Sequence, residues 1–459
     1  MSNTSFFTKD RSFYKALFSM LLIVSLQNLV AFSVNMADNI MLGSYSQHAL
    51  SGAATVNQVF FVVQQFALSL GNSLVALSSQ YWGQKRPGPI RTITGITIKV
   101  SAVIGVIIVL ICLIIPEGIL HIFTTDPVII EEGKNYLFII VWTFLLFLIS
   151  SVLMAALRAV GTVKISFYIS VVSLIVNVGI NYTLIFGKFG FPEMGIRGAA
   201  IGTLISRVLE LVILIVYIAK YDTKLRLFTK GWLVHDSGLF HDFLKIAVPT
   251  VGASVLWSVS VPLQTAVLGH LSADAIAANS VATTFYQYLK VVVQAMSATS
   301  AVMIGQAIGR GDIERVKSDG RTLSVICVGL GVVLGALLFA LKNPLLSLYR
   351  DSFTPEAMQI AENLLIIMSF VMVGMAYQMP VCFGIIQGGG DAKWNMAVNL
   401  ISTWCIVVPL SFMSAFWWKL PVEWVVLCIQ SDQFFKGIPA FIHFRKYKWM
   451  KKLTRETAR

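Results

Sequence analysis

Charged side chains are scarce in this chain of 459 residues, of which only 12% are Asp, Glu, Lys or Arg and 56% are hydrophobic. A soluble globular domain carries roughly 25% charged residues. This shortage leaves too little polar surface to cover a water-soluble protein of this length. The composition therefore excludes an ordinary soluble domain and indicates a protein that lies in a membrane.

Three local signals are also missing. The five cysteines occur singly in apolar runs, without a CxxC pair or a His at ligand spacing, so we interpret them as small core residues. No cleavage-site pattern precedes the first apolar run, which we interpret as a spanning helix rather than a signal peptide. The glycine-rich "QGGGDAK" (387–393) is not followed by GK[ST], so neither a phosphate-binding loop nor a nucleotide-binding domain is predicted.

Long apolar runs, in contrast, recur along the whole chain. A bilayer core of about 30 Å requires roughly 20 apolar residues per helix. The runs are 14–43, 53–80, 92–116, 134–158, 165–187, 197–219, 242–269, 280–305, 321–342, 356–386, 394–417 and 421–444. The predicted fold is therefore an all-α polytopic membrane protein with twelve transmembrane helices.

The net charge of +13 is distributed in a way that argues against nucleic acid as a partner. If the amino terminus lies inside, 26 Lys and Arg fall in inside segments, 6 in outside segments and 3 within spans. This asymmetry follows the positive-inside rule and places both termini in the cytoplasm. The basic tail 445–459 is then expected to rest near anionic headgroups of the cell membrane.

The chain also repeats itself, because "MLGSYSQHAL" (41–50) aligns with "VLGHLSADAI" (267–276) at an offset of 226 residues. At the same offset "SSQYWGQKR" (78–86) aligns with "IGQAIGRGD" (304–312). Two six-helix bundles related by a pseudo-two-fold axis along the membrane normal are therefore predicted, as in transporters with parallel repeats. The predicted domains are a bundle at 1–219, a cytoplasmic linker at 220–241, a bundle at 242–444 and the tail at 445–459.

The ordered motifs "ADNIMLG", "ALSLGNSLVALSSQYWGQKR", "RAVGTVK", "NVGINYTLIFG" and "GIRGAAIGTLIS" have second-half echoes in "VLGHLSADAIAANSV", "AMSATSAVMIGQAIGRGD" and "IIQGGGDAKWN". In this order and over the full chain they resemble the multidrug and toxic compound extrusion (MATE) family of secondary transporters. The resemblance implies two six-helix bundles. It also implies efflux of amphipathic organic cations coupled to inward flow of Na⁺ or H⁺.

Asp38 is a carboxylate inside the first apolar run, three to four residues from its outer end, with Asn28, Asn35 and Asn39 on nearby faces. An acid at the centre of a membrane costs about 2.5–3.5 kcal/mol on insertion scales, so such a residue normally faces a cavity and carries function. The alternative is that Asp38 is solvated at the interface or caps the next turn. The resemblance implies that it couples cation flow.

Further oxygen ligands come from the fifth and sixth runs. Asn177 and Asn181 are four residues apart and therefore share one helical face, and Thr203 is polar within a run of small residues. With Asp38 they provide the hard oxygen atoms that suit Na⁺ or a proton-linked hydrogen-bond network. The alternative is that the two asparagines only hold helices together.

The chain departs from the MATE pattern in two ways. Many first-half sites of the family have a second aspartate where this chain has Asn181. A single acid lacks the like-charge repulsion that favours proton binding in paired sites, which favours Na⁺ over H⁺ here. In addition, 249–269 and 369–387 contain no acid, so a second-half coupling site is not expected.

Lys290, Arg207 and Glu210 are further charged residues within the predicted spans. Lys290 lies about ten residues into the eighth run, some 15 Å deep at 1.5 Å per residue. It is either a cavity residue, which we group with Asn35 as a candidate substrate contact, or a lysine that reaches the interface or lies neutral and desolvated. Arg207 and Glu210 are three apart and are expected to form a structural ion pair.

The sequence thus predicts an antiporter rather than an enzyme, without a cofactor other than the coupling ion. Its expected partners are an amphipathic small molecule and the lipid bilayer, with neither nucleic acid nor nucleotide, and one chain suffices. The alternative is a flippase for lipid-linked saccharides. A flippase should line its cavity with several cations, for which Lys290 is the strong candidate here.

Overall fold

The structure is a computed structural model. It describes residues 6–229, 231–234, 236–269, 273–349 and 353–456. Within these residues the regular structure is entirely helical. Arg350, the last three residues of the predicted tail, and the part of the repeat at 270–272 lie outside the described residues.

Eleven helices in this part of the chain are long and apolar enough to cross a membrane. The first six predicted runs correspond to α1 (Arg11–Tyr45), α2 (Gln47–Gly83), α3 (Pro87–Ile114), α5 (Pro127–Ala159), α6 (Lys164–Ile185) and α7 (Gly195–Lys220), with a short α4 (Pro116–His121) before α5. The next four correspond to α8 (Ser237–Gly269), α9 (Ala273–Arg310), α10 (Ile313–Ser347), and α11 (Pro355–Met379) continued by the π-helix η1 (Pro380–Ile386). The eleventh run is α12 (Ala392–Leu400), η2 (Ile401–Val407), α13 (Val408–Phe412) and η3 (Met413–Trp417).

The twelfth run is a broken helix. It consists of α14 (Val422–Ile429), α15 (Asp432–Phe435) and α16 (Gly437–Arg445). None of the three is long enough to cross a membrane alone, but together they cover the predicted 421–444. All twelve predicted runs therefore correspond to helical elements, which confirms the all-α polytopic fold.

The chain forms two compact units that do not coincide with its two sequence halves. One contains Leu26–Ala247 and Arg455–Arg459, and we call it the N-terminal unit. The other contains Met1–Ser25 and Val248–Thr454, and we call it the C-terminal unit. The helices α1 and α8 therefore each contribute to both units, and the domain boundaries expected from the sequence stay predictions.

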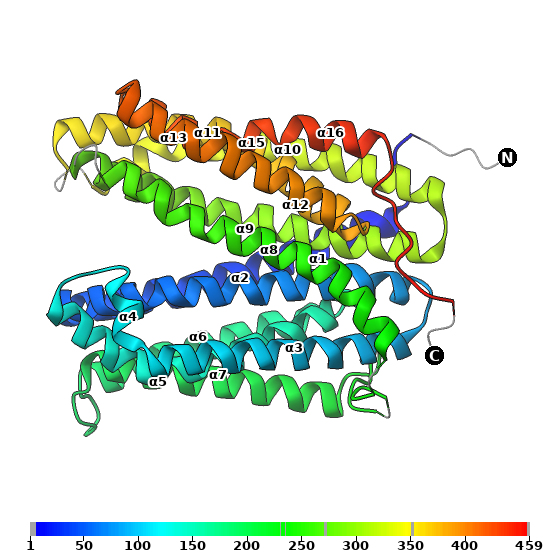
Figure 1. The fold of residues 1–459 in the computed structure, drawn as a ribbon, viewed down its shortest axis with the longest axis horizontal. Helices are drawn as coiled ribbons and strands as arrows, with labels where there is room; N and C mark the ends of the chain where they lie inside the picture. The colour runs from blue at the N-terminus through cyan, green and yellow to red at the C-terminus, as the bar shows by residue number, and fades with distance from the viewer. Residues whose placement is uncertain (1–5, 230, 235, 270–272, 350–352, 457–459) are drawn as a thin grey trace. The chain divides into compact units, whose positions relative to one another are not determined.

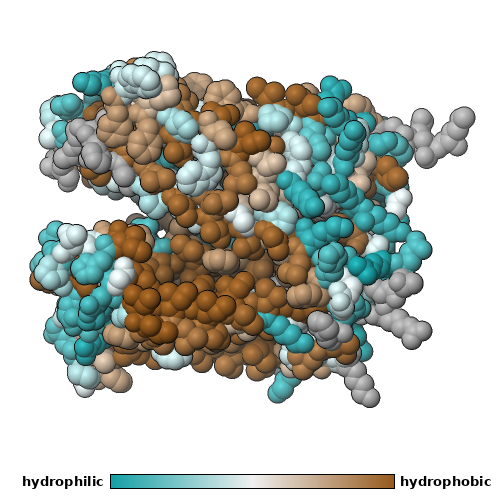
Figure 2. All heavy atoms as spheres, in the orientation of Figure 1, coloured by the Kyte–Doolittle hydropathy of each residue, from teal (hydrophilic) through white to brown (hydrophobic). Residues whose placement is uncertain are grey.

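In the N-terminal unit α5 packs against α2, α3 and α7, while α6 packs against α7 (Figure 1). The core along α5 contains the fully buried side chains Val141, Phe144 and Leu148. Figure 2 shows apolar side chains over the middle of the helices of this unit and hydrophilic ones at their ends. This distribution is what a hydrocarbon layer of about 30 Å requires.

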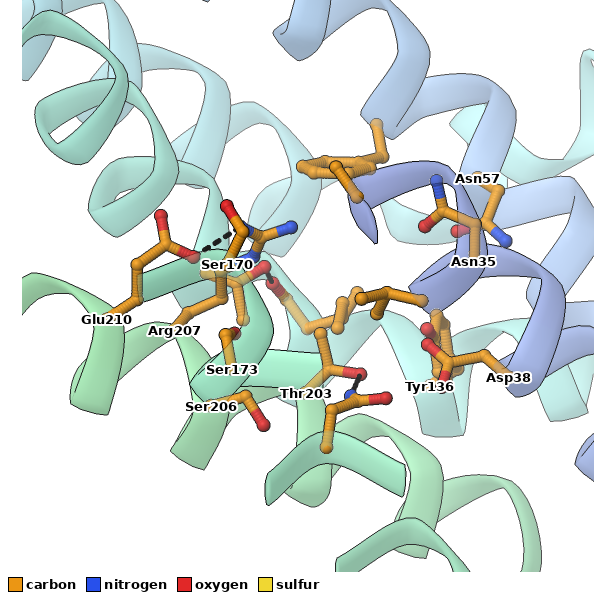
Figure 3. Close-up of a pocket in the computed structure, with 16 residues that line it drawn as sticks. Asn35, Asp38, Asn57, Tyr136, Ser170, Ser173, Thr203, Ser206, Arg207 and Glu210 are labelled. Carbon is orange, nitrogen blue, oxygen red and sulfur yellow. Dashed lines mark hydrogen bonds and ion pairs between the residues drawn. The ribbon is translucent and has the colours of Figure 1, made fainter. Parts of the chain in front are cut away.

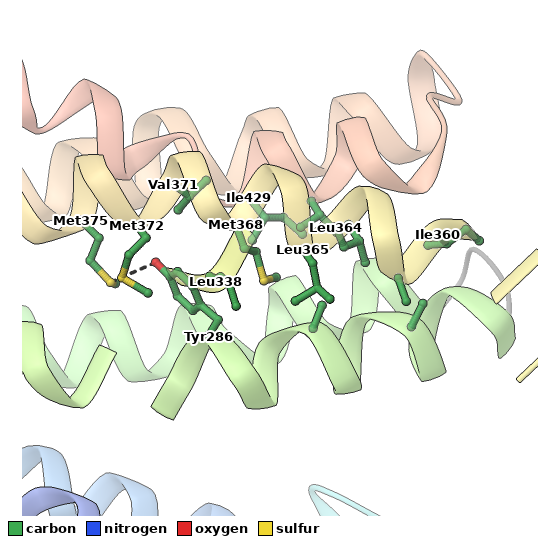
Figure 4. Close-up of a cluster of buried hydrophobic side chains, with 14 of the residues drawn as sticks. Tyr286, Leu338, Ile360, Leu364, Leu365, Met368, Val371, Met372, Met375 and Ile429 are labelled. Atoms are coloured by element: carbon green, nitrogen blue, oxygen red, sulfur yellow. Dashed lines mark hydrogen bonds between the residues drawn. The ribbon is translucent and has the colours of Figure 1, made fainter. Parts of the chain in front are cut away.

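The core of the C-terminal unit lies where α11 packs against α9 and α10 (Figure 4). Leu364, Leu365 and Met368 are fully buried there. The hydroxyl of Tyr286 donates a hydrogen bond of 3.0 Å to the Sδ of Met375. Polarizable methionines fill the irregular space beside the tyrosine.

The basic tail is not a free segment but packs on the protein, and its expected place near lipid headgroups stays a prediction. The side chain of Trp449 is fully buried, stacks on Phe444 at 5.8 Å and donates to the Phe444 carbonyl at 3.0 Å. The backbone N–H of Lys451 donates to the Gly389 carbonyl at 2.9 Å. Aromatic burial, which the charge count does not report, therefore anchors the tail to the C-terminal unit.

Candidate functional site

A polar cavity of about 60 Å³ lies inside the N-terminal unit, between α1, α2, α5, α6 and α7 (Figure 3). A water molecule needs about 10–15 Å³ of such space, so the cavity is large enough for a partly hydrated small ion. The polar residues that line it are Asn35, Asp38, Asn57, Tyr136, Thr143, Ser170, Ser173, Asn177, Thr203, Ser206, Arg207 and Glu210.

Small residues allow α7 to approach α6 closely at this cavity. A Cβ atom added to Gly198 would lie 2.7 Å from the backbone carbon of Leu184, and one added to Gly202 would lie 1.9 Å from the Oδ1 of Asn181. Glycines at these positions let the backbones and the Asn181 amide come together, as small residues do between membrane helices. Thr203 is thereby placed next to the asparagines of α6.

A continuous chain of hydrogen bonds joins the four predicted coupling residues. The Nδ2 of Asn181 donates to the Oδ1 of Asp38 at 2.6 Å and to the Oδ1 of Asn177 at 3.3 Å. The Nδ2 of Asn177 donates to the Oγ1 of Thr203 at 3.2 Å. The structure thus brings all four residues together, from α1 and from the consecutive helices α6 and α7. Their role in ion coupling stays a prediction.

The amide of Asn181 has one unused acceptor. The side chains of Asn177 and Asn181 are fully buried, and within the described residues the Oδ1 of Asn181 has no hydrogen-bond partner. A buried acceptor without a donor costs about 1–3 kcal/mol. A half-turn about the Cβ–Cγ bond would present this oxygen to Asp38 instead of the NH₂ group. The carboxylate oxygen of Asp38 and the amide oxygen of Asn181 would then face each other, an arrangement that suits a small hard cation.

Arg207 and Glu210 form the ion pair that the sequence predicts, and they also line this cavity. The Nη1 of Arg207 donates to the Oε2 of Glu210 at 2.8 Å. The Oγ of Ser150 donates to the Oε1 of Glu210 at 3.0 Å. The guanidinium of Arg207 lies 4.9 Å from the ring centroid of Phe147. A structural role alone was expected for these two residues, because the sequence does not show which way α7 faces.

The two candidate substrate contacts lie in different units. Asn35 lines the cavity beside Asp38, one helical turn away on α1. Lys290 belongs to the C-terminal unit and does not line this cavity. Its Nζ lies 5.8 Å from the ring centroid of Trp257 on α8. Lys290 therefore contacts an aromatic ring within its own unit.

Sequence reasoning missed several cavity residues, among them Asn57 and Tyr136. Asn57 carries a detectable signal, because it is a polar residue within the apolar second run.

Sequence reasoning also missed a buried acid in the second half of the chain. Asp432 at the start of α15 is 7% exposed and accepts a hydrogen bond of 2.8 Å from the Nζ of Lys436, which is 3% exposed. Asp432 lies in the twelfth run, outside the acid-free segments 249–269 and 369–387.

Comparison with known proteins places the chain in a family. The MatE family model matches residues 24–183 and 249–413, which is more than half of the chain. The probable multidrug resistance protein NorM of Thermotoga maritima is 26% identical over 436 residues, which cover 94% of this chain and 92% of that protein. The probable multidrug resistance protein YoeA of Bacillus subtilis is 26% identical over 378 residues, which cover 82% of this chain and 81% of that protein.

A solved structure shows the same fold. A variant of the MATE transporter VcmN of Vibrio cholerae matches with a TM-score of 0.87 and 18% identity, covering 96% of this chain and 98% of that chain. The twelve helical elements, the structural likeness and the family match agree. The chain belongs to the MatE family and is a multi-pass membrane transporter rather than an enzyme.

Proposed function

We propose that this transporter is an antiporter of the cell membrane. It exports amphipathic organic compounds, mostly cationic, in exchange for Na⁺ or H⁺ by alternating access. Two relatives named as multidrug resistance proteins support the substrate class. The asymmetric distribution of Lys and Arg supports cytoplasmic termini. One chain contains the whole coupling cavity, so a monomer suffices.

The chain of hydrogen bonds from Asp38 through Asn181 and Asn177 to Thr203 is the observation that carries this proposal. The coupling ion binds at Asp38 and takes oxygen ligands from the other three residues. Binding of the ion lowers the affinity for the substrate, and binding of the substrate lowers the affinity for the ion by the same factor. The membrane potential supplies about 2.3 kcal/mol per elementary charge per 100 mV for this exchange.

The charge balance of the cavity fits one monovalent coupling ion, and the lone carboxylate favours Na⁺ over H⁺. Two acids, Asp38 and Glu210, and one base, Arg207, line it. Since Arg207 is paired with Glu210, the remaining charge of −1 at Asp38 matches one monovalent cation. A single carboxylate surrounded by neutral oxygens also lacks the second acid with which a proton would be shared.

Uptake of ethidium into everted membrane vesicles tests the proposal, with a Na⁺ or a pH gradient imposed. We expect gradient-driven uptake by the wild-type protein and loss of at least nine-tenths of it in Asp38→Asn. The matched control is Asn39→Ala, because Asn39 is an exposed neighbour that does not line the cavity. Unaltered coupled uptake in Asp38→Asn would refute the site. Absence of gradient-driven uptake, together with binding of polyprenyl phosphates, would favour the flippase instead.

A further inference from the structure

One face of α7 extends the cavity away from the coupling residues. Thr203, Ser206, Arg207 and Glu210 occupy positions i, i+3, i+4 and i+7, and all four line the cavity. Residues at this spacing lie along one side of a helix. At 1.5 Å per residue, Thr203 and Glu210 are about 10 Å apart along the helix axis. Thr203 therefore lies at the Asp38 end, and Glu210 lies at the other end (Figure 3).

Arg207 lies between the two acids of the cavity, Asp38 and Glu210, and its guanidinium is bonded to Glu210. Glu210 accepts its Nη1 hydrogen bond at 2.8 Å, and the ring of Phe147 lies under the guanidinium at 4.9 Å. Both oxygens of the Glu210 carboxylate have a donor, because Ser150 donates to the second one. The acid that holds Arg207 is therefore itself oriented from α5. A fully bonded carboxylate and an aromatic face together form a cage for a cation.

The position of Arg207 matters because a guanidinium keeps its charge under all physiological conditions. Three charged residues line the cavity, and Arg207 is attracted to both Asp38 and Glu210. Released from Glu210, it would neutralise Asp38 and compete with the coupling cation. The apparent affinity for a ligand falls in proportion to the fraction of the protein that is competent to bind it. If Arg207 occupied Asp38 for nine-tenths of the time, the affinity for the cation would fall about tenfold.

We propose that Glu210 is a positioning residue that keeps Arg207 away from Asp38, so that the Asp38 carboxylate stays accessible to the coupling cation. This inference rests on the proposed function of Asp38. It assigns the ion pair of α7 to the electrostatics of the site rather than to the stability of the helix. Phe147 and Ser150 support the same arrangement, since one contacts the guanidinium and the other orients the carboxylate.

Four purified proteins test it: wild type, Glu210→Gln, Glu210→Gln with Arg207→Gln, and Asp38→Asn. The first measurement is equilibrium binding of ²²Na⁺ in detergent. If the wild type binds no Na⁺, the measurement is instead the release of protons when ethidium is added. We expect about tenfold weaker cation binding, or a corresponding loss of proton release, in Glu210→Gln. The double variant should return to within about threefold of wild type, because it removes the competing cation with its partner. Gel filtration and thermal unfolding check that each variant is folded.

The outcomes separate the inference from the proposed function. Wild-type binding in Glu210→Gln would overturn the inference, provided that Asp38→Asn has lost binding. If the double variant bound the cation as weakly as Glu210→Gln does, the inference would also be overturned, because a merely structural ion pair predicts this outcome. Wild-type behaviour of Asp38→Asn in both measurements would refute the proposed function, and the inference with it.

Discussion

The Nδ2 of Asn181 donates a hydrogen bond of 2.6 Å to the Oδ1 of Asp38, across 143 residues of sequence. This bond ties α6 to α1 at the polar cavity. It also relates the orientation of one amide to the availability of one carboxylate. When the NH₂ group of Asn181 faces Asp38, it occupies the Oδ1 of the carboxylate. If the amide is turned by half a turn, the Oδ1 of Asn181 and the Oδ1 of Asp38 both become available to a cation. The orientation of the Asn181 amide therefore decides whether Asp38 meets a donor or a second oxygen.

The substitution Gly202→Ala should damage the site without unfolding the helix. An added Cβ would lie 1.9 Å from the Oδ1 of Asn181, so the amide must move and its bond to Asp38 is lost. We expect gradient-driven ethidium uptake to fall at least tenfold. Ala is a better helix former than Gly, so α7 itself should not be weakened.

The matched control for this substitution is Gly179→Ala on α6. Gly179 has no atom within 4 Å of an added Cβ. Transport by this variant should equal that of the wild type. Equal transport by both variants would show that the position of the Asn181 amide does not matter for coupling.

The substitution Asn181→Asp should change the ion that drives transport. It replaces the amide nitrogen by a second carboxylate oxygen 2.6 Å from Asp38. Two ionised carboxylates at this distance repel each other, so the pair favours the sharing of one proton. We expect Na⁺-driven uptake to fall at least tenfold while uptake driven by a pH gradient persists. The control is Asn39→Asp, which adds an acid at an exposed position of the same region. Unchanged Na⁺-driven uptake in Asn181→Asp would contradict the assignment of this amide as an ion ligand.

Much of the fold was predictable because the length of an apolar run is set by the thickness of the bilayer. Each of the twelve runs became a helical element, and Asn177 and Asn181 share a face because they are four residues apart. The breaks in the twelfth element were not predicted. They separate α14, α15 and α16 at the polar stretch "QSDQ" (430–433) and at Lys436, a signal that the overall hydrophobicity of the run conceals.

The site was predictable only in part, for a similar reason. Asp38 stands out because an acid within an apolar run is costly. The rotation of α7 about its axis depends on packing against α5 and α6, so the sequence could not show that Arg207 and Glu210 face the same cavity. The burial of Trp449 likewise depends on the surface formed by Phe444 and Gly389, whereas the tail itself shows only its basic charge.

Asp432 and Lys436 should depend strongly on each other for the stability of the fold, because both side chains are almost fully buried. The substitution Lys436→Met leaves the acid without its cation and should lower the free energy of unfolding by about 3–5 kcal/mol. The double variant, which adds Asp432→Asn, should recover part of this loss. Thermal unfolding in detergent, followed by tryptophan fluorescence, measures both.

The control for this pair is Lys317→Met. Lys317 pairs with Glu314 at 2.6 Å, but Glu314 is largely exposed. Removal of such a surface pair typically costs at most about 1 kcal/mol. If Lys436→Met were no worse than this control, water would have to reach Asp432, and its pairing would not be needed for folding.

The substitution Trp449→Ala tests whether the tail is a structural element. The indole is fully buried, stacks on Phe444, and lies so close to Gly389 that an added Cβ there would meet it at 2.4 Å. Removal of a buried tryptophan typically costs about 3–5 kcal/mol. We therefore expect a lower unfolding temperature and faster cleavage of the tail by trypsin, both in detergent without anionic lipid. The neighbouring Lys448 is exposed, so Lys448→Ala should change neither measurement. If anionic lipid were required to protect the wild-type tail from trypsin, the headgroup interaction expected from its charge would hold it in place, and the packing of Trp449 would not.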